Sequence, residues 1–244
     1  MRQFGLVGKS LSHSFSKTYF EEKFRRENIS DSSYSLFEIA DIQEIVSFIQ
    51  QHPDLVGFNV TIPYKKTIIP FLDALSDEAA AVNAVNTVLI QRTGNKIVTK
   101  GFNTDIIGFR QSLQGHNLPE SALVLGTGGA AVAVTYVLKG LGCRCTVVSR
   151  DEKRGLPYSA LTEEVIRQHL LIVNCTPLGT YPDINKKPDI PYEGISGDHF
   201  LYDLVYNPAE TAFLKEGICR DAKVLNGLPM LHAQAEAAWR LWNR

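Results

Sequence analysis

The sequence lacks any excess of charge of one sign. Its 25 Lys and Arg side chains are matched by 26 Asp and Glu side chains, which leaves a formal net charge of -1 at pH 7. Proteins that bind nucleic acid or an anionic membrane surface usually carry a strong positive field. We therefore expect no nucleic acid and no membrane among the partners of this protein.

Long hydrophobic runs are also missing. No stretch approaches the roughly 20 apolar residues of a membrane-spanning helix, and the first residues contain no apolar core of a secretory signal. Internal repeats and low-complexity tracts are absent as well. We expect a globular cytoplasmic protein, and 244 residues suffice for two modest domains or one large one.

Cysteine is scarce, with four residues in the whole chain. Cys143 and Cys145 are too close in sequence for an ordinary structural disulfide, and a zinc site would need further ligands at a spacing that the sequence does not offer. We interpret these side chains, together with Cys175 and Cys219, as reduced and mostly buried thiols. No metal is expected.

One glycine cluster stands out against these absences. The apolar run 123–125 leads into Gly126-Thr-Gly-Gly-Ala130, and the apolar helix-forming segment 130–138 follows. Gly126, Gly128 and Ala131 fit the pattern G-x-G-x-x-G/A, in which the first glycine permits a tight turn and the second admits a pyrophosphate. The helix N-terminus then offers N–H groups to that anion. The stretch predicts a nucleotide-binding turn.

The residues after the next apolar run, 145–148, predict which nucleotide is bound. An NAD site usually has an acidic residue there that accepts from the ribose 2′-hydroxyl. This sequence has Ser149 and Arg150 instead, and a guanidinium suits a 2′-phosphate. Asp151 opposes that phosphate, whereas Lys153 and Arg154 add positive charge. The pattern favours NADP, and its alternative is an exposed loop arginine.

Strands and helices alternate along the chain, which predicts an α/β fold. In the second half, the predicted strands 123–125, 145–148, 171–175, 200–205 and 223–225 are separated by helices, which is typical of a parallel sheet with its sites at the carboxyl ends of the strands. In the first half, strands are predicted at 4–8, 34–39, 55–60 and 84–90, the last forming a hairpin with 96–100. Helices are predicted from about 16, from Asp41, at 77–82, at 101–113 and at 230–242, and the clearest linker is 115–121.

Several polar residues near predicted strand ends have two readings each. Ser14 or Ser16 could cap the helix that begins near 16, or the two serines together could hold a carboxylate. Lys65, taken alone, is most simply a solvated lysine. Asn86 could form a local turn, and Asp105 could be an ordinary acid in the first turn of a helix.

A series of short motifs in a fixed order resembles the shikimate dehydrogenase family along nearly the whole chain. The matching segments are 14–16, 58–65, 84–87, 103–105, 126–130, 174–179, 206–208 and 227–231 with Gln234. The resemblance implies an N-terminal α/β substrate domain at 1–103, a Rossmann-like NADP-binding domain at 104–227 and a C-terminal helix at 228–244 that packs on the first domain. It implies the reversible NADPH-dependent reduction of 3-dehydroshikimate to shikimate, in aromatic amino-acid biosynthesis, by a monomer or homodimer with a small-molecule substrate.

The resemblance also implies a role for each matching position. Lys65 and Asp105 are the expected catalytic pair. Substrate binding falls to Ser14 and Ser16 for the carboxylate, to Thr61, Asn86, Asp105 and Gln234 for the ring hydroxyls, and to Lys65 and Tyr206. NADP(H) binding falls to Gly126, Gly128, Gly129 and Ala130 at the pyrophosphate, Ser149 and Arg150 at the 2′-phosphate, and Thr176 and Gly227.

The chain departs from the family pattern at a few positions, and two other functions stay open. Ile106 stands where the family usually has glycine, Asp151 where it has threonine, and Ser10 where proline is common. One alternative is a quinate or quinate/shikimate dehydrogenase that also uses NAD, although Ser16 rather than threonine favours shikimate. The other is a non-catalytic NADP(H)-binding regulator, which the intact Lys65 and Asp105 disfavour.

Overall fold

The computed structural model describes residues 1–11 and 15–244. It divides into two compact units, of which the first comprises Met1–Thr104 with Ala235–Arg244 and the second Asp105–Gln234. The second unit is therefore inserted in the chain between two parts of the first. The domain limits expected from sequence, 1–103, 104–227 and 228–244, stay a prediction.

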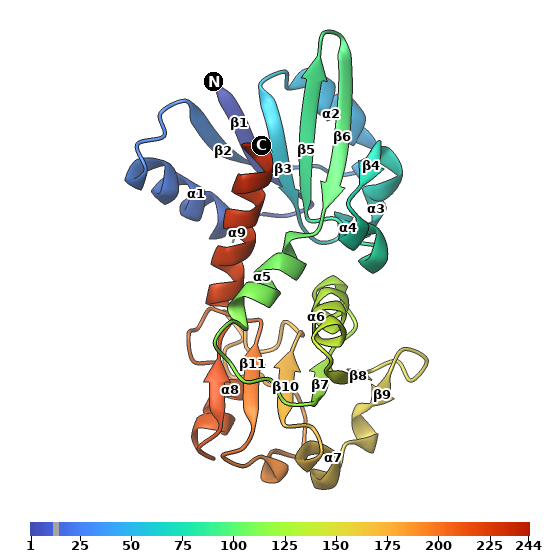
Figure 1. Cartoon of the computed structure of the whole chain (residues 1–244), viewed down its shortest axis with the longest axis vertical. Coiled ribbons are helices and arrows are strands. Elements are labelled where there is room, and N and C mark those ends of the chain that lie inside the picture. The colour runs from blue at the N-terminus through green and yellow to red at the C-terminus, as the bar shows by residue number, and fades with distance from the viewer. Residues whose placement is uncertain (12–14) are drawn as a thin grey trace. The chain divides into compact units, whose positions relative to one another are not determined.

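The sheet of the first unit is mixed and has six strands in the order β2-β1-β3-β5-β6-β4 (Figure 1). The strands are β1 (Arg2–Gly8), β2 (Ser32–Glu38), β3 (Leu55–Val60), β4 (Ala74–Leu75), β5 (Thr87–Thr93) and β6 (Lys96–Phe102). β1 runs parallel to β2 and β3, whereas β5 is antiparallel to β3 and β6. The carboxyl ends of β1, β2 and β3 and the start of β5 therefore meet at one edge of the sheet.

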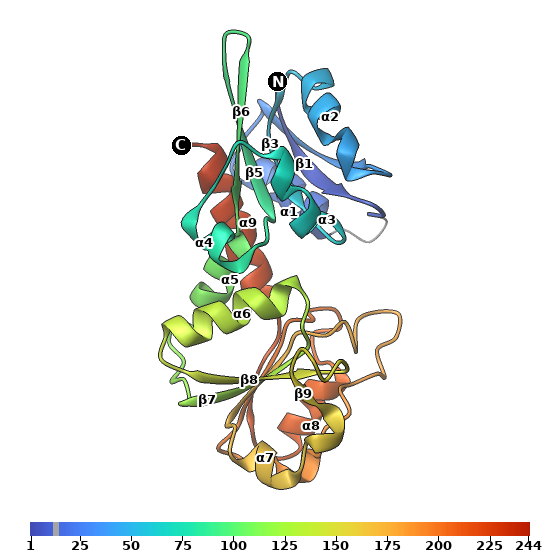
Figure 2. The ribbon, with the colours of Figure 1, turned by 90° about the vertical axis from the view of Figure 1, so that its right-hand side faces the viewer.

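Helices cover both faces of this sheet (Figures 1 and 2). They are α1 (Phe15–Arg26), α2 (Ile45–Gln51), α3 (Tyr64–Thr67), α4 (Asp77–Val82) and the end of α9 (Leu228–Trp242), with 3₁₀ turns at Ile42–Glu44 and Ile69–Phe71. Side chains of β1 alternate between the faces, as the period of two requires. Phe4 and Leu6 pack with α1 and α9, and Val7 belongs to the core cluster under α2 and α3.

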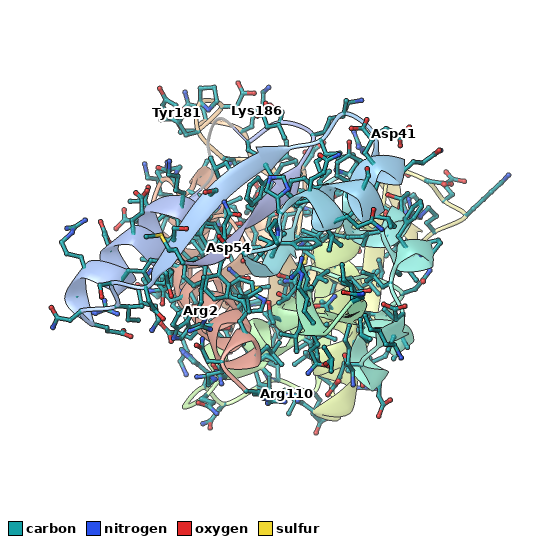
Figure 3. All side chains as sticks on the ribbon, turned by 90° about the horizontal axis from the view of Figure 1, so that it is seen from above. Arg2, Asp41, Asp54, Arg110, Tyr181 and Lys186 are labelled. Carbon is teal, nitrogen blue, oxygen red and sulfur yellow. The ribbon has the colours of Figure 1, made fainter. Side chains whose placement is uncertain are left out.

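The last residues of α9 complete the core of the first unit. The Trp242 ring stacks on Phe4 with ring centroids 5.0 Å apart, and its Nε1 donates to the Val88 carbonyl at 3.0 Å. A Cβ on Gly57 would lie 2.3 Å from the same indole. Arg2, labelled beside this helix in Figure 3, donates to Asn243 Oδ1 at 2.7 Å and lies over the Phe4 ring. The helix end is thus held by contacts on several sides.

The second unit contains a parallel six-stranded sheet in the order β12-β11-β10-β7-β8-β9. The strands are β7 (Ser121–Leu125), β8 (Arg144–Ser149), β9 (Leu156–Pro157), β10 (Leu171–Asn174), β11 (Phe200–Asp203) and β12 (Lys223–Leu225). Counted within the unit, this is the 3-2-1-4-5-6 order of a dinucleotide-binding Rossmann sheet. Its topological switch point lies between β7 and β10.

Helices lie on both faces of the second sheet, with α6 opposite α7 and α8 (Figure 2). They are α5 (Thr104–Ser112), α6 (Gly129–Gly140), α7 (Glu163–Arg167) and α8 (Ala212–Ile218), with 3₁₀ turns at Tyr158–Ala160 and Tyr192–Gly194. Leu123, Leu125 and Ile172 pack with α7 and α8. On the other face the Phe109 ring of α5 stacks on Tyr202 at 5.1 Å. The predicted α/β fold with a Rossmann-like domain is confirmed.

Local bounds differ from the sequence-based expectation in several places, and two of them have a clear physical reason. Asp41 caps the 3₁₀ turn Ile42–Glu44 by accepting from the Gln43 N–H, and α2 begins only at Ile45. The strand expected at 84–90 begins at Thr87, because the N–H groups of Val85 and Asn86 bond to Lys65 and Phe102 outside the regular ladder. Within the part of the chain that the structure describes, no helix is long and apolar enough to cross a membrane.

Candidate functional site

Several predicted substrate residues gather at the edge of the first sheet where β1 to β3 end. Thr61 directly follows β3, and its N–H donates to the Val7 carbonyl at 3.0 Å. Lys65 lies in the short helix α3, and its carbonyl accepts from the Val85 N–H at 2.7 Å. Asn86 directly precedes β5. These bonds fix Thr61, Lys65 and Asn86 to neighbouring strand ends.

A buried phenol holds α3 in this place. Tyr64 is 5 % exposed, and its hydroxyl donates to the carbonyls of Ile39 and Ala40 just after β2, at 2.6 and 2.9 Å. The backbone of the neighbouring residue, half-buried Lys65, is therefore anchored on both sides. This is a more constrained position than the solvated surface lysine that the sequence alone favoured.

Asn86 is the centre of a buried hydrogen-bond network and not a simple turn former. Its side-chain oxygen accepts from the Thr104 N–H at 2.6 Å, from the Thr104 hydroxyl at 3.1 Å and from the Thr87 hydroxyl at 3.2 Å. Thr104 begins α5, and the next residue is Asp105, which is 8 % exposed. Asn86 thus fixes the start of the helix that carries the predicted catalytic acid.

The same network extends to the start of α1. The Tyr34 hydroxyl donates to Asn59 Oδ1 at 2.8 Å, and Asn59 Nδ2 donates to Thr87 Oγ1 at 3.0 Å. Burial raises the pKa of Tyr34, and a hydrogen bond from the Ser16 side chain opposes that rise. Ser16 is therefore linked through Tyr34 and Asn59 to the residues around Asn86. Ser14 lies outside the described residues.

No site role was predicted from the sequence for Tyr34, Asn59, Thr87 or Thr104. Asn59 and Thr87 face each other across the β3–β5 pairing, but Tyr34 comes from β2 and Thr104 from α5. Asn59 and Thr61 alternate along an extended segment and so share one face of it, but such a local pattern does not reveal partners on other elements.

Gln234 lies on α9 where this helix packs against α5. A Cβ on Gly108 would lie 2.6 Å from the Met230 carbonyl oxygen and 2.9 Å from Gln234 Cβ, so only glycine permits this approach. The Gln234 amide donates to the Leu231 carbonyl at 3.1 Å. Ile106, which replaces the family glycine, has a completely buried side chain within the regular helix α5.

The glycine cluster forms the turn that the sequence predicted. Gly126 has φ of +110° and donates its N–H to the Val148 carbonyl at 2.9 Å. Gly128 is the N-cap of α6, and a Cβ built there would meet nothing within 4 Å. Gly129 and Ala130 open the helix, and Ala131 is buried at 2 % exposure. A pyrophosphate could approach the backbone at Gly128 and the first helical N–H groups.

The loop after β8 is organised by Asp151. Its N–H donates to Ser149 Oγ at 3.0 Å, its carboxylate accepts from the Lys153 N–H at 3.1 Å, and its carbonyl accepts from the Arg154 N–H at 2.9 Å. The Arg154 guanidinium donates to the Thr127 carbonyl of the glycine turn at 2.8 Å. Arg154 was only a supporting charge in the sequence analysis, because this contact depends on the path of the loop.

Arg150 is exposed at the end of β8. Burial raises the pKa of Tyr158, and the positive charge of Arg150 opposes that rise. The exposed Arg150 side chain is accessible to an anion in solvent.

The loops after β10, β11 and β12 carry the other predicted cofactor and substrate residues. Thr176 donates its N–H and hydroxyl to Asn174 Oδ1 at 3.0 and 2.6 Å. Tyr206 is half-buried, and burial raises its pKa. Gly227 donates its N–H to the Val205 carbonyl at 3.1 Å, and a Cβ there would lie 2.0 Å from the Leu204 carbonyl oxygen. These loops follow the carboxyl ends of the parallel strands, where ligands bind in this architecture.

The predicted site residues are therefore divided between the two units. Ser16, Thr61, Lys65 and Asn86 belong to the first unit, and Asp105, Tyr206, Gln234 and the predicted cofactor residues belong to the second. Among the residues 1–11 and 15–244, no group of three or more His, Cys, Asp or Glu side chains could hold a metal ion.

Comparison with known proteins gives consistent matches. A family described as "Shikimate dehydrogenase substrate binding domain" matches residues 6–88. "Shikimate dehydrogenase (NADP(+))" of Caldicellulosiruptor bescii is 34 % identical, over 99 % of this chain and 89 % of the relative. The crystal structure of shikimate 5-dehydrogenase from Thermus thermophilus in complex with NADP(H) and shikimate is similar with a TM-score of 0.86 and 33 % identity, covering 99 % of this chain and 93 % of that one. Quinate dehydrogenase from Corynebacterium glutamicum in complex with NAD is similar with a TM-score of 0.89 and 28 % identity, at 99 % and 93 % coverage.

Proposed function

This chain belongs to the shikimate dehydrogenase family, and we propose that it catalyses the reversible NADPH-dependent reduction of 3-dehydroshikimate to shikimate. The observation that carries the proposal is the identity of 34 % with an NADP-dependent shikimate dehydrogenase over 99 % of the chain. The Rossmann strand order and the glycine turn supply a cofactor domain for this reaction. The catalysed step is an oxidoreduction of a secondary alcohol.

The residues around the glycine turn fit NADP(H). Gly126, Gly128, Gly129 and Ala130 would hold the pyrophosphate, since the Cβ position of Gly128 faces open space and the α6 N-terminus follows. Arg150 would grip the 2′-phosphate beside Ser149. Asp151 uses its carboxylate to accept from the Lys153 N–H, so it builds the loop that presents Arg150 even though its charge opposes the phosphate.

Proton handling in this mechanism falls to Lys65 and Asp105. When bound, the nicotinamide supplies the hydride chemistry. Reduction of the ketone creates an alkoxide that needs a proton, and oxidation of the alcohol releases one. Lys65 donates or accepts this proton as general acid or base, and Asp105 shares the charge of the pair. The anchored α3 and the Asn86 bond to Thr104 hold both backbones in place.

Substrate binding is assigned to the remaining polar residues. Ser16, together with Ser14, would hold the substrate carboxylate. Thr61, Asn86 and Gln234 would meet the ring hydroxyls, and Tyr206 would also contact the substrate. Thr176 and Gly227 would line the nicotinamide half of the cofactor site. Binding would exclude water from the reactants and align them.

The first experiment measures turnover of shikimate and quinate with NADP and with NAD by nicotinamide absorbance. We expect the highest kcat/KM for shikimate with NADP. Preference for quinate with NAD would instead favour a function like that of the Corynebacterium glutamicum relative. A protein that binds NADPH by fluorescence but turns over neither acid would be a regulator.

Arg150→Ala tests the phosphate site, with Arg144→Ala as its control. Arg144 opens the same strand, and its side chain is 81 % exposed. Loss of a charged hydrogen bond should weaken NADP binding roughly tenfold to a hundredfold, while NAD binding changes little. An unchanged NADP-to-NAD ratio in Arg150→Ala would move the phosphate site to Lys153 and Arg154.

Lys65→Ala and Asp105→Asn test the catalytic pair, with Lys66→Ala as the control. Lys66 is the exposed next residue of α3. Each substitution in the pair should lower kcat by roughly 10²–10⁴-fold with a smaller effect on KM. The double substitution should cost much less than the product of the single ones. A kcat within about threefold of wild type in either variant, far below that contribution, would refute the assignment.

We further propose that the enzyme acts in the cytoplasm as a monomer or homodimer on a small-molecule substrate. Light scattering coupled to size-exclusion chromatography would give the oligomeric state, and cell fractionation would give the location.

A further inference from the structure

Asp203 is a fully buried carboxylate at the end of β11, with 0 % exposure. Its Oδ1 accepts from Asn174 Nδ2 at 2.9 Å and from the Val205 N–H at 3.0 Å, and its Oδ2 accepts from the Thr211 hydroxyl at 2.5 Å. These donors come from β10, from the segment that follows β11 and from the N-cap of α8. One side chain therefore joins the ends of two adjacent strands to the start of a helix.

One arm of this arrangement leads to the loop after β10. Asn174 receives a fixed orientation from Asp203 and accepts with its Oδ1 from the N–H and the hydroxyl of Thr176. The Thr176 methyl carbon lies 3.3 Å from the position of a Cβ on Gly126, the first glycine of the nucleotide turn. The orientation of the Asn174 amide thus sets the position of Thr176 against that turn.

The other arm leads to the loop after β12. The Val205 N–H bonds to Asp203, and the Val205 carbonyl accepts from the Gly227 N–H at 3.1 Å. Gly227 itself lies against the Leu204 carbonyl so closely that a Cβ could not fit. A change at Asp203 would therefore reach Gly227 through a single residue.

The charge of Asp203 is balanced by hydrogen-bond donors. The titratable groups that its charge influences are the Cys175 thiol and the Tyr192 phenol, both acids whose pKa is raised by burial. Burial also raises the pKa of Asp203, to about 6, against the opposing effect of its hydrogen bonds from Thr211, Val205 and Asn174. Burial of a carboxylate reduces the free energy of unfolding, and this carboxylate lies beneath loops that the proposed function assigns to cofactor binding.

We infer that Asp203 is a positioning residue for the nicotinamide half of the cofactor site, because it sets Thr176 through Asn174 and Gly227 through Val205. The inference rests on the proposed function for the identity of the cofactor. Asp203 does not touch the cofactor in this assignment. Its ionised carboxylate accepts from all three donors at once, and a protonated carboxyl would bring a further hydrogen into the same space.

Two substitutions of Asp203 distinguish the loss of the two hydrogen-bonded arms, to Thr176 and to Gly227, from the loss of the negative charge. Asp203→Ala removes both arms. Asp203→Asn can keep its amide oxygen at the Oδ1 position, where it accepts from Asn174 and Val205, while its amide nitrogen donates to the Thr211 oxygen. We expect Asp203→Ala to lower kcat/KM for NADP and to weaken NADPH binding more than tenfold. Asp203→Asn should recover most of both, and KM for shikimate should change less than that for NADP in each variant.

Thr211→Val is the matched control for general loosening. Thr211 caps α8 by accepting from the Leu214 N–H at 3.2 Å, so its loss destabilises the same region without removing either arm. NADPH affinity of Thr211→Val should stay within twofold of wild type while its unfolding midpoint falls. Equal losses of affinity in Thr211→Val and Asp203→Ala would overturn the inference, as would unchanged affinity in Asp203→Ala.

The pH dependence of NADPH affinity adds a measurement that a general loss of stability would not change. NADPH affinity of the wild type should fall as the pH decreases through about 6. The 2′-phosphate titrates near this pH as well, so the decisive quantity is the difference between the pH profiles of wild type and Asp203→Asn. The profile of Asp203→Asn should lack the contribution from titration of the Asp203 carboxyl group. Identical profiles would overturn the inference. Because affinity is measured by NADPH fluorescence, these results stand whether or not wild type oxidises shikimate, and the two proposals fail separately.

Discussion

Removal of one buried hydroxyl, in Tyr34→Phe, should weaken both the first unit and its substrate site. The Tyr34 phenol donates to Asn59 Oδ1 at 2.8 Å and lies in the core of the unit with 3 % exposure. Phenylalanine keeps the ring, which stacks on Phe20 at 4.4 Å, and removes only the oxygen. The effect is therefore confined to hydrogen bonding and leaves apolar packing in place.

The magnitude follows from what the substitution leaves behind. Asn59 Oδ1 loses its phenol donor in a site that is 6 % exposed, and a buried acceptor that loses its partner costs about 1–3 kcal/mol. Urea denaturation of the wild type and the variant measures this loss of unfolding free energy. Because the Ser16 hydroxyl also loses its bond to the phenol, KM for shikimate should rise while KM for NADP stays unchanged.

Tyr202→Phe is the control for this prediction. Tyr202 is fully buried in the second unit, and its hydroxyl bonds to Ser112 Oγ at 2.7 Å, but Ser112 also donates to the Phe109 carbonyl. Its loss should cost less stability and leave KM for shikimate unchanged. The reasoning is refuted if Tyr34→Phe changes stability and KM no more than Tyr202→Phe does.

Three further predictions concern other contacts. Gly227→Ala should weaken NADPH binding by fluorescence titration, because its Cβ would lie 2.0 Å from the Leu204 carbonyl oxygen; unchanged binding would contradict a role at the cofactor site. Glu236→Gln should destabilise the fold by about 1.5–3 kcal/mol, because the buried Lys23 ammonium loses a carboxylate partner. Burial raises the pKa of Glu236, but hydrogen bonds from Tyr19 and Lys23 leave it below 4.5. The difference in unfolding free energy between wild type and Glu236→Gln should therefore narrow as the pH falls below that value, and a constant difference would contradict a contribution from the ion pair. Burial raises the pKa of Asp203 from 3.8 to about 6. The unfolding free energy of wild type relative to Asp203→Asn should therefore fall by about 3 kcal/mol as the pH rises through this range. An increase in this free-energy difference would show that the ionised carboxylate is stabilising.

The elements with a strong local pattern could be predicted from the sequence. β3 and α4 have the expected limits, Leu55–Val60 and Asp77–Val82, because an apolar run marks the strand and a run of helix-forming residues marks the helix. The glycine turn was predictable from spacing and from the conformations that only glycine adopts easily. The limits of the short helix Tyr64–Thr67 could not be predicted, since four residues are too few to display a helical period.

The contacts that fix the candidate site could not be predicted from the sequence. Taken alone in the sequence, Lys65 was most simply a solvated surface lysine. The contacts that anchor it come from Tyr64, which bonds to the segment just after β2, and from Val85. Asp203 was visible only as part of a predicted strand, since two of its three donors lie 29 residues before it and 8 residues after it. Such partners follow from the path of the chain between strands, which no local pattern encodes.

The division of the chain has a consequence for the order in which the protein matures on the ribosome. Domains generally fold as units, with the N-terminal one first, but here the first hundred residues await Ala235–Arg244, which emerge after the whole of the inserted unit. Until Trp242 arrives, the surfaces of Phe4, Gly57 and Val88 that it covers have no occupant from that helix. The inserted unit can therefore finish first, and the earliest-made segment stays open to chaperones and proteases for longest.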